Sequence, residues 1–140
     1  MPYQYGEIFE LLGVPGMGRQ GSGWCGINKD GVLVLMSHQN FFHRRPSGEY
    51  YYDAPGDPRL PSSSASAARS LRIIAEYFEP NRAVLLPIGE FVSDGGPNAK
   101  GELEAAVFRR ATGAVYRAKM RAFEPDNGRI VCDVESKFQV

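Results

Sequence analysis

Residues 24–36, WCGINKDGVLVLM, place one apolar segment on each side of Lys29-Asp30-Gly31. A three-residue loop that ends in glycine is typical of a β-hairpin, because its last position takes a left-handed backbone that glycine adopts without steric cost. Segments 24–27 and 32–36 are therefore predicted to be paired antiparallel strands. The second segment is an unbroken apolar run, which indicates a buried strand.

The same type of loop recurs twice in the last forty residues. Ala111-Thr112-Gly113 separates segments 106–110 and 114–123, and a turn containing Asp126-Asn127-Gly128 separates 114–123 from 129–138. Three loops of one kind predict a mainly antiparallel sheet whose C-terminal part is a meander.

Two helices are predicted beside this sheet. The principal helix begins at Ser66 and ends at Phe78, because apolar side chains recur there at three- to four-residue spacing and Pro80 follows. Residues 6–14 have the pattern of a short N-terminal helix. Segment 82–92 is predicted to be a strand, and Pro87 within it predicts an edge position or a bulge.

The expected fold class is α+β: a strongly bent, mainly antiparallel sheet or partly closed small barrel, with the principal helix packed on it. At 140 residues, one globular domain over 1–140 is the expected organisation, although a chain of this kind is also compatible with being one domain of a longer protein. This outline is analogous to small barrel-like readers in which an antiparallel sheet carries a base-sized pocket.

The composition limits the classes of partner. Sixteen basic and sixteen acidic residues cancel, so the chain as a whole has no attraction to nucleic acid or to acidic membranes. Apolar runs of about five residues are too short to span a bilayer, and no signal peptide is visible, so a cytoplasmic location and no membrane partner are expected. Cys25 and Cys132 are expected to be reduced and structural, and no residue spacing predicts a metal or a cofactor.

Most of the residues with side chains suited to binding or catalysis lie between Gly31 and Tyr52. Here a buried strand leads into a basic and aromatic segment, residues 37–52, with both histidines of the chain. Rings that stack on bases and cations that contact phosphates are the combination that single-stranded or flipped bases require. The simpler alternative is a hairpin whose rings alternate between core and surface.

The favoured function is accordingly a non-enzymatic binding module, with a nucleic acid that carries an unpaired or modified base as its ligand. Its site is expected where residues 37–52 meet the glycine-rich segment 15–23. The candidate stacking residues are Trp24, Phe41, Tyr50 and Tyr52, and the candidate polar or charged contacts are His38, His43, Arg44 and Arg45.

A second basic group is predicted along one face of the strand 114–123. Arg117, Lys119 and Arg121 alternate there, and with Arg19 they are candidates for contacts to a phosphate backbone. In the predicted register, Cys132 is opposite Ala122, Asp133 is opposite Arg121 and Glu135 is opposite Lys119. Acidic partners in these positions would neutralise most of the basic row.

Two other functions remain open at the level of the sequence. The first is a small enzyme with His38 or His43 as general base near Asp94. The second is a protein-interaction domain that uses the same aromatic surface. A G-x-G-x-x-G match at residues 16–21 lacks the strand before it and the helix after it that dinucleotide binding requires, so a glycine-rich connection is the better interpretation.

Overall fold

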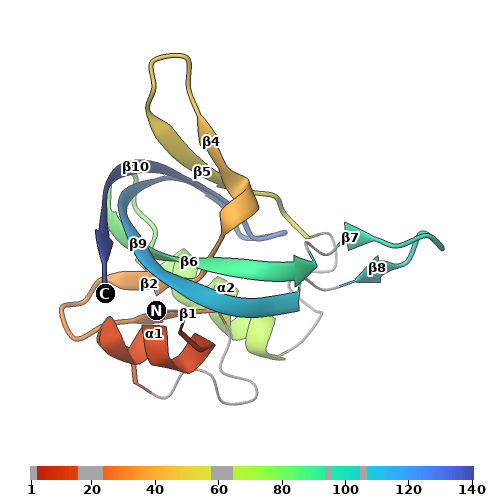
Figure 1. Ribbon diagram of the computed structural model, residues 1–140, viewed down its shortest axis with the longest axis horizontal. Helices are drawn as coiled ribbons and strands as arrows, with labels where there is room; N and C mark the ends of the chain where they lie inside the picture. The colour runs from red at the N-terminus through yellow and green to blue at the C-terminus, as the bar shows by residue number, and fades with distance from the viewer. Residues whose placement is uncertain (1–2, 16–23, 58–64, 94–95, 105–106) are drawn as a thin grey trace.

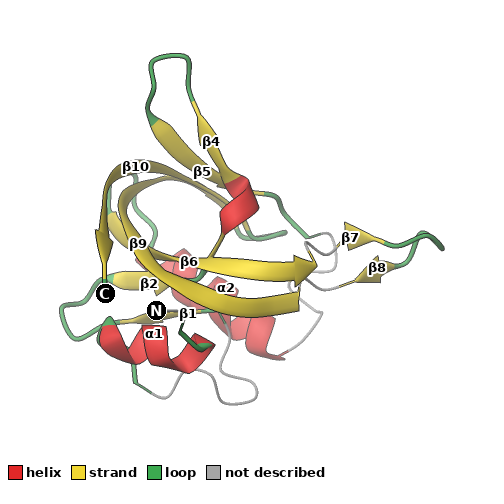
Figure 2. Cartoon of the chain, viewed as in Figure 1, coloured by secondary structure: helices red, strands yellow, loops and turns green. Residues whose placement is uncertain are grey.

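The computed structural model describes residues 3–15, 24–57, 65–93, 96–104 and 107–140. They form an α+β fold around one eight-stranded, mostly antiparallel sheet in the order β1-β2-β6-β9-β10-β5-β4, with β3 also paired to β6 (Figure 2). The sheet strands are β1 Cys25–Ile27, β2 Leu33–Leu35, β3 Ser37–His38, β4 Phe42–Arg44, β5 Tyr50–Ala54, β6 Ala83–Ser93, β9 Val107–Glu124 and β10 Arg129–Gln139. The remaining elements are helices α1 Tyr5–Leu11 and α2 Ala65–Tyr77, the 3-10 turn η1 Gln39–Phe41, and the small hairpin β7 Gly96–Pro97 with β8 Leu103–Glu104.

The sheet is strongly bent but not closed. Strands β9 and β10 curve together as a long arc, and the hairpin β4–β5 projects from one end of the sheet (Figure 1). Register shifts between β6 and β9 and between β9 and β10 accompany this curvature, as β-bulges commonly do. The predicted bent antiparallel sheet is confirmed, and β1 and β4 are its two edges.

The apolar run of residues 32–36, which contains strand β2, contributes side chains to both faces of the sheet. Leu33 and Leu35 belong to the core cluster under α2, whereas Val34 and Met36 belong to the cluster under α1. Because successive side chains of a strand point to opposite faces, a strand covered on both faces must be apolar at every position. The sheet therefore lies between two hydrophobic cores.

Both predicted helices are present. Helix α2 begins and ends one residue before the predicted bounds, and it buries Leu71, Ile74 and Tyr77, while Phe78 just beyond it is only partly buried. Helix α1 buries Ile8 and Phe9 completely.

The predicted hairpin between residues 24–27 and 32–36 is confirmed as β1 and β2, with Gly31 at a φ of 77°. The predicted turn at Ala111-Thr112-Gly113 is wrong, because β9 runs through it without interruption. Gly113 does have a left-handed backbone, with a φ of 89°, but there it forms a bulge in β9 opposite the segment between Pro87 and Gly89. A left-handed glycine serves a bulge and a turn equally well.

Pro87 lies in a central strand, so the predicted edge position is wrong and the predicted bulge is right. Strand β6 has β9 on one side, and β2 and β3 on the other. Strand β2 pairs with Val84 and Leu85, whereas β3 pairs with Ile88 and Gly89. Pro87 therefore lies opposite the break between β2 and β3, where its missing N–H group costs no ladder bond.

The C-terminal hairpin is confirmed, but its predicted register is wrong. The register is off by one position up to Val131, which lies opposite Ala122, and by two positions from Cys132 to Val134. The turn between Glu124 and Arg129 has four residues, which gives the first shift, and a bulge between Val131 and Cys132 adds the second. Cys132 therefore lies opposite Met120 rather than Ala122, and Asp133 opposite Lys119 rather than Arg121. A bulge adds a residue to one strand, and the turn residues alone do not reveal it.

Candidate functional site

The hairpin β4–β5 carries most of the predicted site residues. Phe42 pairs with Tyr52, His43 with Tyr51 and Arg44 with Tyr50. At its tip the N–H group of Arg45 donates to the carbonyl oxygen of Glu49 over 2.8 Å, and Gly48 has a φ of 95°. Since directly paired residues share a face, the hairpin has one face with the Phe42 and Arg44 pairs and another with the His43 pair.

On the first face, Arg44 and Tyr50 form a composite surface. The Arg44 guanidinium lies 4.7 Å from the centroid of the Tyr50 ring, and its Nη2 donates to the Tyr50 hydroxyl over 2.6 Å. Arg44 is exposed, and Tyr50 keeps 38% of its surface accessible. A guanidinium that lies over one tyrosine ring can contact a second planar group on its other side.

Three further aromatic rings lie on the same face of the hairpin and on strand β9. The centroid of the Phe42 ring lies 4.7 Å from that of Tyr52 and 4.7 Å from that of Tyr116 on β9, and Lys137 Nζ on β10 lies 6.0 Å from the Tyr116 centroid. We call the four rings the aromatic row: Tyr50, Tyr52, Phe42 and Tyr116. Arg44 and Lys137 are its cationic ends, and within the described part of the chain neither forms an ion pair.

Tyr52 belongs to the core rather than to the surface. It is 3% exposed, its hydroxyl accepts a hydrogen bond of 3.1 Å from the N–H group of His38, and burial raises its pKa above the usual range. Its predicted role as a stacking residue is therefore wrong for this structure, because neither ring face is open. Tyr52 instead supports Phe42 from behind.

The two histidines have different surroundings. His38 is 5% exposed, and its ring lies between Phe41 and Phe91, with centroids 4.4 and 4.3 Å away. Its Nδ1 accepts a hydrogen bond from the N–H group of Asn40 over 3.0 Å. His43 is exposed, with its ring 5.3 Å from that of Tyr51. The structure therefore places His38, Phe41 and His43 outside the aromatic row, and Asp94 lies outside the described residues.

On the second face of the hairpin, Arg45 is held in place. Its guanidinium lies 4.5 Å from the Tyr51 centroid, and its Nη2 lies 3.0 Å from Asp133 Oδ1 on β10. Asp133 also accepts a hydrogen bond from Nε of Arg121, whose Nη1 donates to Asn81. Arg45 is half-buried rather than freely exposed, in contrast to Arg44.

The predicted basic row on β9 is largely neutralised. Arg121 is paired with Asp133, Lys119 Nζ lies 3.4 Å from Glu135, and the Arg117 guanidinium lies 4.1 Å from the Phe138 centroid. The predicted acidic partners are therefore confirmed as ion pairs, although the register is shifted. Arg19, the fourth candidate for backbone contacts, lies outside the described residues.

The remaining candidates, Trp24 and the two cysteines, pack in or against the hydrophobic core. Trp24 is half-buried against the core cluster under α2, and its backbone N–H group donates to Ser70 Oγ over 3.1 Å. Cys25 and Cys132 are both free and buried, as predicted. Burial raises the pKa of each thiol to about 12, which removes the thiolate that a nucleophile requires.

Sequence reasoning missed Tyr116, Lys137 and Asp133 as neighbours of the hairpin. Tyr116 and Lys137 pair across β9 and β10, and Asp133 pairs with Tyr51. The pairing of β10 with β5 joins segments about eighty residues apart, and no local pattern in the sequence indicates it.

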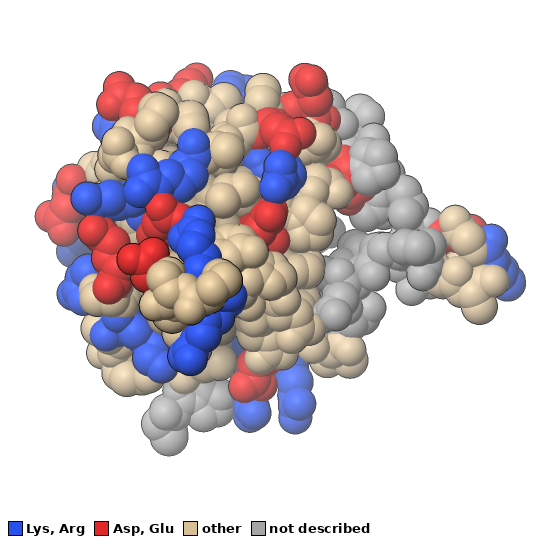
Figure 3. All heavy atoms as spheres, turned by 90° about the horizontal axis from the view of Figure 1, so that it is seen from above, with Lys and Arg blue, Asp and Glu red and all other residues tan. Residues whose placement is uncertain are grey.

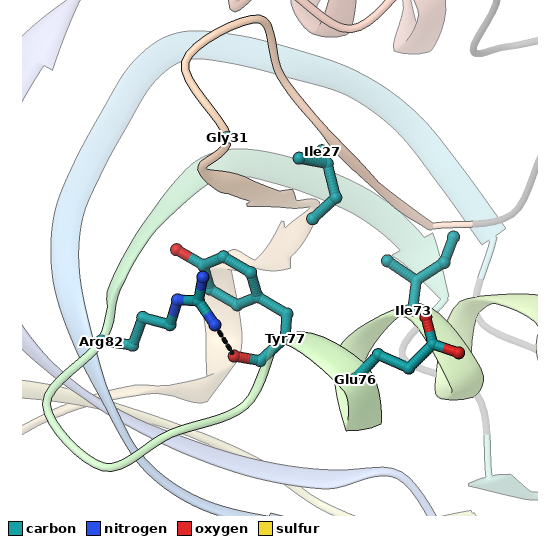
Figure 4. Close-up of a pocket in the computed structure, with 6 residues that line it drawn as sticks. All are labelled: Ile27, Gly31, Ile73, Glu76, Tyr77 and Arg82. Carbon is teal, nitrogen blue, oxygen red and sulfur yellow. Dashed lines mark hydrogen bonds between the residues drawn. The ribbon is translucent and has the colours of Figure 1, made fainter.

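Two hollows in the described surface lie away from the row. The first, of about 300 Å³, lies between the β1–β2 hairpin and α2 and is lined by Ile27, Gly31, Ile73, Glu76, Tyr77 and Arg82 (Figure 4). In it, Arg82 covers the Tyr77 ring and donates to the Tyr77 carbonyl oxygen over 2.9 Å. The second, of about 280 Å³, lies between the end of α1 and the β1–β2 turn.

The surface around the hairpin carries both signs of charge. On the side from which the hairpin projects, Lys and Arg are interspersed with Asp and Glu (Figure 3). Among the described residues, no group of three or more His, Cys, Asp or Glu side chains is arranged to hold a metal ion. No described helix is long and apolar enough to cross a membrane.

Scans of the chain against protein-family models, curated proteins and solved structures found no match.

Proposed function

We propose that this protein is a non-enzymatic module that binds nucleic acid containing an unpaired or modified base through the accessible rings of the aromatic row, whereas Tyr52 is buried behind them. The observation that carries the proposal is the pairing of exposed cations with rings at both ends of the row. Arg44 lies against Tyr50, and Lys137 lies over Tyr116.

The chemistry of this arrangement suits a base and its phosphates. Base–aromatic stacking contributes about 1–3 kcal/mol per base and tolerates any base, because every base has a π-face. A guanidinium plane offers a further surface on which an unpaired base stacks. Arg44 and Lys137 have no carboxylate partner in the described structure, so their charge is available to phosphates.

The mixed charge of the surrounding surface limits the expected affinity. With two unpaired cations at the row, few phosphates are neutralised, so the salt dependence is expected to be shallow. Binding is then expected to depend more on stacking, and single-stranded ligands are expected to bind better than intact duplexes.

The test is a titration of the protein with labelled single- and double-stranded oligonucleotides, plain and base-modified, at low salt. Tyr50→Ala should weaken single-strand binding by about 5- to 150-fold, which corresponds to the loss of one stacked base. Arg44→Ala should weaken binding and reduce the salt slope by about 0.7, the value for one phosphate contact on a single strand.

Arg72→Ala is the matched control, because it removes one exposed cation from α2 and is not part of the row. It should change neither affinity nor salt slope. If the parent protein binds none of the oligonucleotides at tens of micromolar, the nucleic-acid proposal is wrong and a protein partner becomes the better hypothesis for the aromatic surface.

A further inference from the structure

Arg44 and Arg45 are adjacent in the sequence but face opposite sides of the hairpin. Arg44 lies on Tyr50 without an ion pair in the described structure, whereas Arg45 lies on Tyr51 and is paired with Asp133. We propose that Asp133 withholds Arg45 and Arg121 from phosphate groups and so confines phosphate binding to the face of Arg44. This inference rests on the proposed function for its ligand.

The geometry makes Asp133 the centre of a three-residue cluster. Asp133 is the direct partner of Tyr51 in the β5–β10 pairing, so it lies on the face that Arg45 occupies. Its Oδ1 lies 3.0 Å from Arg45 Nη2, and its Oδ2 accepts from Nε of Arg121. One carboxylate thus contacts guanidinium groups from the hairpin tip and from β9.

The carboxylate is charged under ordinary conditions. Partial burial acts to raise its pKa, but hydrogen bonds from Arg121 and Arg45 outweigh it, and the pKa of Asp133 lies below its usual range. A phosphate that approached Arg45 would find its Nη2 donor already in contact with this carboxylate, and it would meet the repulsion of a like charge close by. Charge-assisted pairs of this kind are stronger than neutral hydrogen bonds.

The variant that tests the proposal is Asp133→Asn, which keeps the size of the side chain and frees two guanidinium groups. Single-strand affinity at low salt should increase, and the salt slope should become steeper by about 0.7 for each released arginine that contacts a phosphate. A merely structural role for Asp133 would not steepen this slope. Arg45→Ala in the parent should leave the slope unchanged, whereas in the Asp133→Asn background it should remove part of the gain.

Asp126→Asn is the matched control. It makes the same change in net charge in the turn between β9 and β10, where Asp126 is exposed. Asp133 lies four residues into β10, roughly 13 Å along the strand from its first residue. The proposal is supported if Asp133→Asn increases the single-strand affinity and steepens the salt slope and Asp126→Asn does neither. Equal effects of the two variants, or a flatter slope in Arg45→Ala like that of Arg44→Ala, would overturn it.

A second probe separates this inference from the proposed function. Inorganic polyphosphate carries phosphates without bases, so the same variants can be titrated with it at low salt. Tighter polyphosphate binding by Asp133→Asn than by the parent and Asp126→Asn supports the role of Asp133 even if no oligonucleotide binds. Indistinguishable polyphosphate binding by all three proteins contradicts it.

Discussion

The exposure and the interactions of a side chain in this protein depend on its immediate surroundings more than on its residue type. Arg44 and Arg45 share one chemistry and are adjacent, yet one is exposed on a tyrosine and the other is held by a carboxylate. Both cysteines are buried, and desolvation raises the pKa of each to about 12. The structure thus distinguishes the two neighbouring arginines, which the sequence alone does not.

The cysteines give a prediction at the residue scale. At pH 8 only about one thiol in ten thousand is ionised in the folded protein, so neither should react with a thiol reagent until the chain unfolds. Because folding raises both pKa values, the unfolded chain loses these protons first as the pH rises. The free energy of unfolding should therefore fall from about pH 8.5 upwards.

The measurement is the rate of reaction with a chromogenic disulfide in native buffer and in denaturant. Cys25→Ser and Cys132→Ser assign each thiol, and any catalytic activity found in this protein should survive Cys25→Ser. Rapid reaction of either thiol in native buffer would contradict the burial described above.

At the scale of elements, α2 stabilises the sheet through one face. Ile74 is 1% exposed and lies in the same core as Leu33, Leu86 and Met120. Ile74→Ala should lower the free energy of unfolding by about 2–5 kcal/mol, because it removes buried methyl groups and leaves a cavity.

The comparison for Ile74→Ala is Arg72→Ala on the exposed side of the same helix. Surface changes of this kind usually stay within about 0.5 kcal/mol. Denaturant unfolding of both variants measures the difference. A midpoint for Ile74→Ala within error of the parent would mean that α2 contacts the sheet through another face.

The elements that the sequence predicts correctly are those with local signals. The sequence predicts helix α2 to within one residue at each end, because a 3.6-residue apolar period and a following proline are local signals. The glycine-ended loops identified two hairpins correctly. They failed at Gly113, because the pairing of β9 with β6 along most of its length keeps the strand extended there.

At the scale of the whole molecule, the sheet couples two cores. Strands β2 and β9 both contribute to the cluster under α1 and to the cluster under α2. Because neither core can lose its strands without disrupting the other, the described fold should unfold in one cooperative transition.

Trp24 provides a probe for this coupling, since it packs on the α2 side. Phe9→Ala, which removes a fully buried ring from the α1 side, should shift the unfolding midpoint by tryptophan fluorescence and by circular dichroism equally. Two separated transitions, or a Phe9→Ala shift seen by only one probe, would show that the cores unfold independently.

Local sequence patterns are sufficient to predict the fold class, the principal helix, two of the three proposed hairpin turns and the buried thiols. Each of these depends on interactions between neighbours in the chain, such as apolar period, turn chemistry and the hydrophobicity of single residues. The same reasoning identifies residues 37–52 as the segment with most of the candidate binding chemistry.

Which of those side chains face outward, and which groups they contact, depends on how distant segments pack together. The bulge between Val131 and Cys132 sets the register of β10, and the pairing of β10 with β5 brings Asp133 to Tyr51 and Arg45. The packing of Phe42 on Tyr116 likewise joins β4 to β9. These contacts join segments far apart in the chain, and their geometry comes from burial and strand pairing across the whole sheet rather than from any local pattern.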